Sequence, residues 1–166
     1  MKRLLLTLAI LLAFSTNSQQ INHTYDHTPY VERYVLDQVC KDYLNSDVVI
    51  EYISESPLHS YIGGVTHELG PHHYLIQLSA FVPSEINRMK ILLHEVGHVI
   101  DMETGRLDFQ TQTWDGIQYP PMAWPDRPWE HSADQWAECL FYEYVIEPEL
   151  KRRGLIPVAG PRIKFD

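Results

Sequence analysis

Residues 94–98 read His-Glu-Val-Gly-His, with two histidines four positions apart and a glutamate directly after the first. On an α-helix such histidines lie about 40° from each other and one turn along, so His94 and His98 can bind one tetrahedral ion. Glu95 is rotated by about 100° from His94, which puts it beside the ion and not on it. The spacing predicts a zinc site in which Glu95 is the general base of a hydrolysis.

A catalytic zinc needs a third protein ligand and a fourth position for water. Asp101 is seven residues beyond His94, about 10 Å along the helix, so it is expected to be a neighbouring or supporting acid and not a ligand. Thr104 occupies the place of the third histidine in the longer H-E-x-x-H-x-x-G-x-x-H pattern, which disfavours that class. The better candidate is Glu130, thirty-two residues after His98 and at the head of the next long helix.

Glu130 is followed four positions later by Asp134, so both carboxylates are expected on one helical face. One of them can bind the ion while the other accepts a hydrogen bond from the free ring N–H of a ligand histidine. This E-x-x-x-D pattern resembles the gluzincin class of H-E-x-x-H peptidases, of which thermolysin is an example. Residues 130–137 and the small size are also similar to minigluzincins and ImmA/IrrE-like peptidases.

The resemblance spans roughly residues 72–142, with about ten positions carrying it. It implies Zn²⁺ as cofactor, Glu130 as the third metal ligand, and Asp134 as the residue supporting a ligand histidine. It also implies that the strand before the zinc helix, His73–Ser79, borders the cleft and pairs with extended substrate. Such enzymes add a side chain that stabilises the oxyanion, and Tyr119, His131 and His72 are the candidates here.

The pattern along the chain predicts a small single-domain α+β fold. A helix is expected after Thr28-Pro29, with Val31, Tyr34, Val35, Val39, Tyr43 and Leu44 as its apolar stripe. Strands are expected at 48–53, around 61–67 and at 73–79, forming a short twisted mixed sheet with an edge strand. The zinc helix follows from Pro83-Ser84 to Gly105, and a second ligand-bearing helix starts at Pro128. The proline-rich stretch 108–128 is expected to be an ordered loop beside the site.

The first residues have the three-part layout of a secretory signal peptide, with two basic residues, the apolar run Leu4 to Phe14 and a polar end. We expect cleavage near Ser18, leaving residues 19–166 as an exported peptidase domain, periplasmic or secreted. The sequence has a formal net charge of −9. This charge argues against nucleic acid and anionic membranes as partners, and no stable membrane association is expected after the leader is removed.

Cys40 and Cys139 are the only cysteines. In an exported chain they could form one disulfide or remain two separate thiols, and the sequence leaves both open.

The substrate is expected to be a peptide or protein. One alternative is a processing factor of narrow specificity that cuts a single protein partner. Another is a secreted, non-catalytic binding module with a structural zinc or none. Glu95 argues against the binding module, because a structural zinc site does not require a general base.

Overall fold

A computed structural model describes residues 30–155 of the chain. The predicted leader, residues 1–18, lies outside the described residues. Within them the chain forms the predicted α+β architecture, with a three-stranded sheet, helices packed on it and a second, very small sheet. None of the described helices combines the length and the apolar character that a membrane span requires.

The first described helix, α2, runs from Tyr30 to Tyr43 and begins where the Thr28-Pro29 pair predicted. Its rotation differs from the predicted stripe. Val31 and Tyr34 are exposed, while the inward face consists of Glu32, Val35, Leu36, Val39 and Cys40. The pattern was misleading because the inward face includes a carboxylate, which an apolar stripe does not predict.

The main sheet contains β1 (Val49–Ser56), β2 (Gly64–Gly70) and β3 (His73–Ser79) in the order β1-β3-β2. β3 pairs parallel with β1 and antiparallel with β2, so the predicted mixed sheet is confirmed. β3 is therefore the central strand, and its backbone is already hydrogen-bonded on both sides. The expectation that His73–Ser79 pairs with substrate is wrong, because the edge strands of this sheet are β1 and β2.

Helix α3 (Glu85–Glu103) carries the His-Glu-Val-Gly-His motif and starts as predicted, with the Ser84 hydroxyl accepting a hydrogen bond from the Asn87 N–H. After the helix, Gly105 has φ +74°, a conformation that favours glycine and permits the turn.

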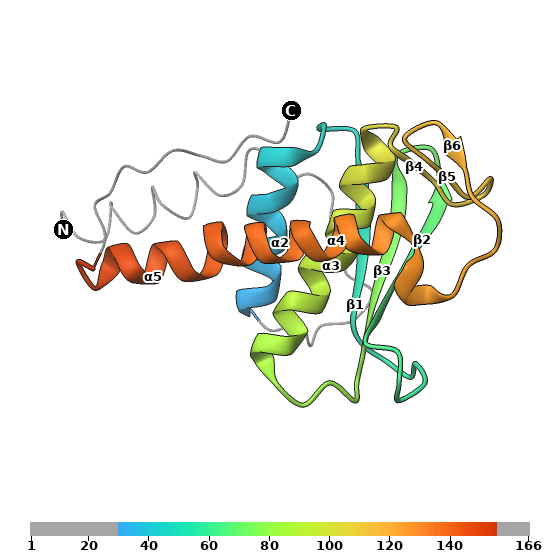
Figure 1. Ribbon diagram of the computed structural model, residues 1–166. Coiled ribbons are helices and arrows are strands. Elements are labelled where there is room, and N and C mark those ends of the chain that lie inside the picture. Colours follow the sequence, from blue (N-terminus) through green and yellow to red (C-terminus); the bar gives the residue numbers. More distant parts are fainter. Residues whose placement is uncertain (1–29, 156–166) are drawn as a thin grey trace.

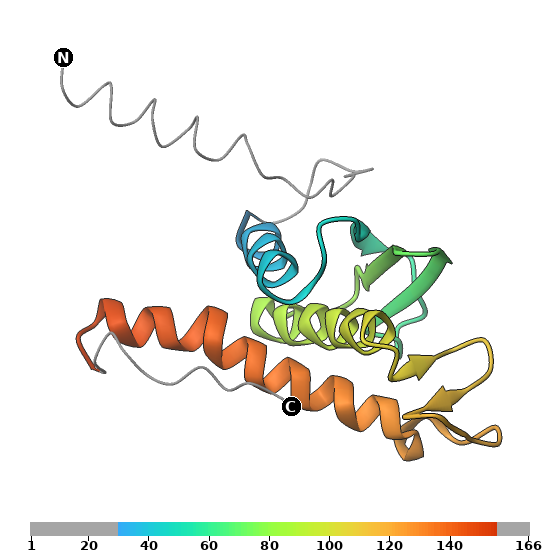
Figure 2. The same ribbon diagram turned by 90° about the horizontal axis from the view of Figure 1, so that it is seen from above.

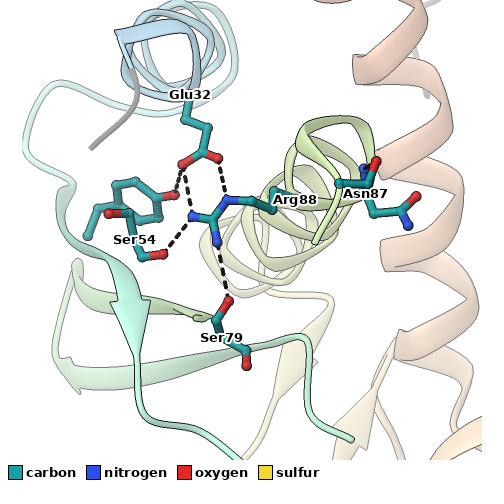
Figure 3. A network of polar contacts seen from close by, with 7 residues as sticks. Glu32, Ser54, Ser79, Asn87 and Arg88 are labelled. Carbon is teal, nitrogen blue, oxygen red and sulfur yellow. Dashed lines mark hydrogen bonds and ion pairs between the residues drawn. The ribbon is translucent and has the colours of Figure 1, made fainter. Parts of the chain in front are cut away.

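A buried ion pair fixes α3 against α2 and the sheet (Figure 3). Arg88 Nε donates to Glu32 Oε1 at 2.9 Å, and the same guanidinium donates to the backbone carbonyls of Ser54 and Ser79. The other Glu32 oxygen accepts from the Tyr52 hydroxyl at 2.5 Å. These contacts join α2, both parallel strands and α3 at one point, so they set the position of the helix that carries the motif.

The segment expected to be a loop contains regular structure. Three two-residue strands, β4 (Leu107–Asp108), β5 (Thr113–Trp114) and β6 (Ile117–Gln118), form an antiparallel sheet, and Trp124–Asp126 forms a 3₁₀ turn, η1. Leu107 of β4 and Trp114 of β5 are buried in one cluster with Trp129 of the following helix. The prolines concentrate after β6, which explains why the earlier part can pair.

Helix α4 (Pro128–Phe141) begins at the predicted proline. It continues through a π-helical turn, η2 (Tyr142–Ile146), into α5 (Glu147–Arg152). Figure 1 shows α4, η2 and α5 as one long rod that crosses α3. No disulfide joins Cys40 on α2 to Cys139 on α4.

Figure 2 shows the layers: α2 and α3 lie on one side of the sheet, and α4 runs along the opposite side of α3. The main core lies between these layers, with residues from α2, β1, β3, α3 and α4. Because α3 is enclosed between the sheet and α4, its residues can meet groups from both.

Candidate metal centre

Three potential metal ligands come together where α3 meets the first turn of α4. Oε2 of Glu130 lies 3.3 Å from Nε2 of His94 and 3.6 Å from Nε2 of His98. One donor atom from each of the three residues lies within 4.8 Å of the other two. Among the residues that the structure describes, no other group of three or more His, Cys, Asp or Glu side chains meets this condition. The three predicted ligands therefore lie together.

The donor set fits Zn²⁺ in chemistry and in spacing. Zinc binds imidazole nitrogen and carboxylate oxygen at about 2.0–2.2 Å, and two ligands at a tetrahedral angle are then about 3.4 Å apart. The two distances from Glu130 to the imidazole nitrogens match that edge. The ring centroids of His94 and His98 lie 4.8 Å apart at an interplanar angle of 88°, and Nε2 of each ring faces the same oxygen of Glu130.

Gly97, inside the motif, lets the two ligand-bearing helices approach each other. A Cβ atom at this position would lie 2.8 Å from Cβ of Trp136 and 3.2 Å from Cα of Ala133. Both neighbours belong to α4, and neither atom is the far end of a flexible side chain. The glycine therefore sets the distance between α3 and α4, and with it the distance between the histidines and Glu130.

Replacing Gly97 by Val is expected to destabilise the fold by roughly 1–3 kcal/mol through overpacking, and to weaken zinc binding because α4 must move away. Chemical denaturation and competition with a chromophoric chelator measure the two effects. Gly70→Val is the control, because a Cβ at Gly70 meets nothing within 4 Å. Equal stability and zinc affinity in Gly97→Val and wild type would contradict the close-approach argument.

Glu95 points from α3 toward the edge strand β2. Its side chain is buried, and Oε2 accepts a hydrogen bond from the Thr66 hydroxyl at 2.7 Å. Gly64, two residues earlier on β2, leaves room for the carboxylate, since a Cβ there would lie 2.8 Å from Oε1. Oε1 accepts no hydrogen bond from any described side chain of β2. One oxygen of Glu95 is thus held and the other is free to interact with a small molecule.

Sequence reasoning missed Thr66. It lies on the inward face of β2 opposite Ile76 of β3, so its position depends on the register of two strands. A threonine in an extended segment carries no signal of its own, and the Gly63-Gly64 pair was the only nearby hint of a close approach.

The carboxylates of Glu95 and Glu130 differ in protonation behaviour. Burial raises the pKa of Glu95, against the opposing effects of the imidazoles and the Thr66 hydrogen bond. Burial also acts on Glu130, but the adjacent imidazoles of His94 and His98 outweigh it and lower the pKa of Glu130 to about 2. Glu130 is therefore anionic at neutral pH, as a metal ligand must be.

Asp134 lies where the pattern placed it. Its Oδ1 is 2.9 Å from Nδ1 of His94, so it can accept the second ring N–H of that candidate ligand. The Asp134 side chain is 70% exposed, so water competes for this contact.

The three candidates for oxyanion stabilisation are placed differently. The Tyr119 ring packs edge-on against Trp129, the neighbour of Glu130, at 6.4 Å. His131 is exposed on α4. His72 is tied by Nδ1 to Glu103 at the far end of α3, so the structure does not bring it to the ligands. Tyr119 also lines a hollow of about 620 Å³ together with Gln110, Thr111, Gln112, Gln118, Pro120 and Pro121.

Comparison with known proteins adds no family assignment: no protein-family model matches the sequence, and neither a curated protein nor a solved structure matches it. The side chains and their geometry are therefore the basis for a functional proposal.

Proposed function

We propose that this protein is a zinc-dependent peptidase that hydrolyses peptide bonds with Glu95 as general base. The observation that carries the proposal is a buried glutamate directly beside a group of two imidazoles and one carboxylate at zinc-ligand spacing. A structural zinc site needs only ligands. A buried acid, fixed by Thr66 on one oxygen, is an additional feature that general-base catalysis uses.

Each residue of the site has a separate role in the proposed hydrolysis. His94, His98 and Glu130 would hold the ion, which when bound supplies Lewis-acid polarisation of the scissile carbonyl and lowers the pKa of water. Glu95 accepts the proton of the attacking water on Oε1, the oxygen that Thr66 leaves free, and delivers it to the leaving amine. Asp134 holds the His94 ring through Nδ1. Tyr119 is the proposed oxyanion donor, since its ring packs on the residue next to Glu130.

The edge strand β2 supports an extended peptide as substrate. Within the described residues β2 pairs with β3 on one side only, so its other edge can hydrogen-bond to a peptide backbone. Thr66 and Gly64 of the same strand contact Glu95, so a peptide paired with β2 would lie beside the proposed general base. We propose that the protein acts after export, on a peptide or protein, in accordance with the predicted leader.

Metal removal and restoration test the proposal. The purified protein, with residues 1–18 absent, is expected to contain one zinc per chain by elemental analysis and to cleave members of a peptide mixture detected by mass spectrometry. A chelator should abolish cleavage, and an equimolar amount of Zn²⁺ should restore it. Bound zinc without cleavage of any peptide would favour a non-catalytic binding module, and a protein that binds no zinc would contradict the proposed peptidase.

A further inference from the structure

Buried polar atoms without a partner gather around the proposed zinc site. Among the described residues, only three buried side-chain atoms lack a hydrogen bond: Nδ1 of His98, Oδ2 of Asp101 and Nε1 of Trp129. Such atoms are rare in folded proteins, and each calls for an explanation. His98 is a proposed ligand, Asp101 follows it by one turn of α3, and Trp129 precedes Glu130. Their concentration at one place points to a local function.

His98 needs an acceptor when it binds a metal. Its Nε2 faces Glu130 at 3.6 Å, so Nδ1 is the nitrogen that carries hydrogen in a metal-binding imidazole. A ligand histidine regularly donates this second N–H to a carboxylate, a carbonyl or water. His94 has such a partner in Asp134, whereas Nδ1 of His98 is buried and has no partner among the described residues.

Asp101 carries a carboxylate, which is a hydrogen-bond acceptor of the kind that His98 Nδ1–H needs. Its carboxylate is fully buried, and Oδ1 accepts from Trp136 Nε1 at 3.1 Å and from Arg106 at 3.3 Å. Ser132 interacts with the same carboxylate but leaves Oδ2 without a hydrogen bond of acceptable geometry. Burial raises the pKa of Asp101, and the polar groups of Ser132, Trp136 and Arg106 oppose this effect. The carboxylate is therefore fixed by α4 and by the turn after α3, with one oxygen still able to accept.

We propose that Asp101 is the hydrogen-bond acceptor for His98 Nδ1–H and thereby positions the second metal ligand. This inference rests on the proposed zinc site. Residues three apart on a helix face are neighbours with about 5–6 Å between their Cβ atoms, so a small rotation of either side chain, or one buried water, closes the contact. His94 and His98 then each have a carboxylate, one exposed and one buried.

The buried partner has the larger effect on metal binding, because water does not compete for it. Asp101→Asn keeps an oxygen that accepts from Trp136 and Arg106. Its amide NH₂ then faces the imidazole, and this NH₂ cannot accept a hydrogen bond from His98 Nδ1–H. We expect zinc affinity, measured by chelator competition, to fall about 10–100-fold, and to fall less in Asp134→Asn. In ¹⁵N-detected spectra of the zinc-free protein, where no metal fixes the tautomer, the His98 ring nitrogens should lose the preference for the Nδ1–H tautomer in the same variant.

Trp136→Phe separates positioning from structural support. It removes the Trp136 hydrogen bond to Asp101 but leaves Oδ2, so we expect lower thermal stability with zinc affinity within about threefold of wild type. If Trp136→Phe loses as much affinity as Asp101→Asn, or if Asp101→Asn retains wild-type affinity and His98 tautomer, Asp101 has no positioning role. A wild-type protein that fails to bind zinc would overturn the proposed function as well, whereas normal zinc binding with an unchanged Asp101→Asn overturns this inference alone.

Discussion

Glu95→Gln is expected to reduce peptide hydrolysis about 10²–10⁴-fold while zinc remains bound. The amide has nearly the same size and can still contact the Thr66 hydroxyl, so the packing between α3 and β2 should persist. It cannot take a proton from water, however, and general-base catalysis contributes about this factor. Initial rates on a peptide found in the cleavage mixture, together with zinc content by elemental analysis, measure the two properties separately.

Glu138→Gln is the matched control. It makes the same chemical change, from a carboxylate to an amide, at a residue that is exposed on α4. It should retain both zinc and activity. Loss of zinc from Glu95→Gln would show that Glu95 supports the metal and would leave the base unassigned. Full activity in Glu95→Gln with zinc bound would reject Glu95 as general base and with it the proposed mechanism.

The candidate ligands could be predicted from sequence because their spacing is local. His94 and His98 are four residues apart on one helix, and Glu130 and Asp134 are four apart on another, so helical geometry alone fixes each pair. What joins the pairs is the contact of α3 with α4, to which Gly97 contributes by leaving room for Trp136 and Ala133. The sequence contained this glycine, but its role required the partner helix.

Strand order and the polar core could not be predicted in the same way. His73–Ser79 directly precedes the motif-bearing helix in sequence, yet it is the central strand and β2 lies at the edge. β3 can pair parallel with β1 only because the intervening segment, which contains β2, carries the chain back to the end of the sheet where β1 starts. Thr66 reaches Glu95 only in this register. Glu32 was missed because a charged residue in a helical stripe is normally a surface residue; here Arg88, from a segment more than fifty residues later, compensates its burial.

The Arg88–Glu32 pair provides the second large prediction. Arg88→Met is expected to destabilise the fold by about 3–5 kcal/mol, since it leaves the Glu32 carboxylate buried without its cation. The Glu32 side chain is only 5% exposed, and that of Arg88 only 12%. Two backbone carbonyls, those of Ser54 and Ser79, also lose their donor. The loss is a large part of a typical stability of about 5–15 kcal/mol and is measurable by urea denaturation.

A double variant shows whether the cost comes from the unpaired charge. Glu32→Leu combined with Arg88→Met removes both charges, so it should be clearly more stable than Arg88→Met alone. Arg33→Met, at an exposed position on α2, controls for the loss of a positive charge and should stay within about 0.5 kcal/mol of wild type. If Arg88→Met is equally benign, the pair does not hold α3 in place. Because Arg88 lies less than two helical turns before His94, a displaced α3 would also move the candidate ligands, so the same variant should bind zinc more weakly even where it remains folded.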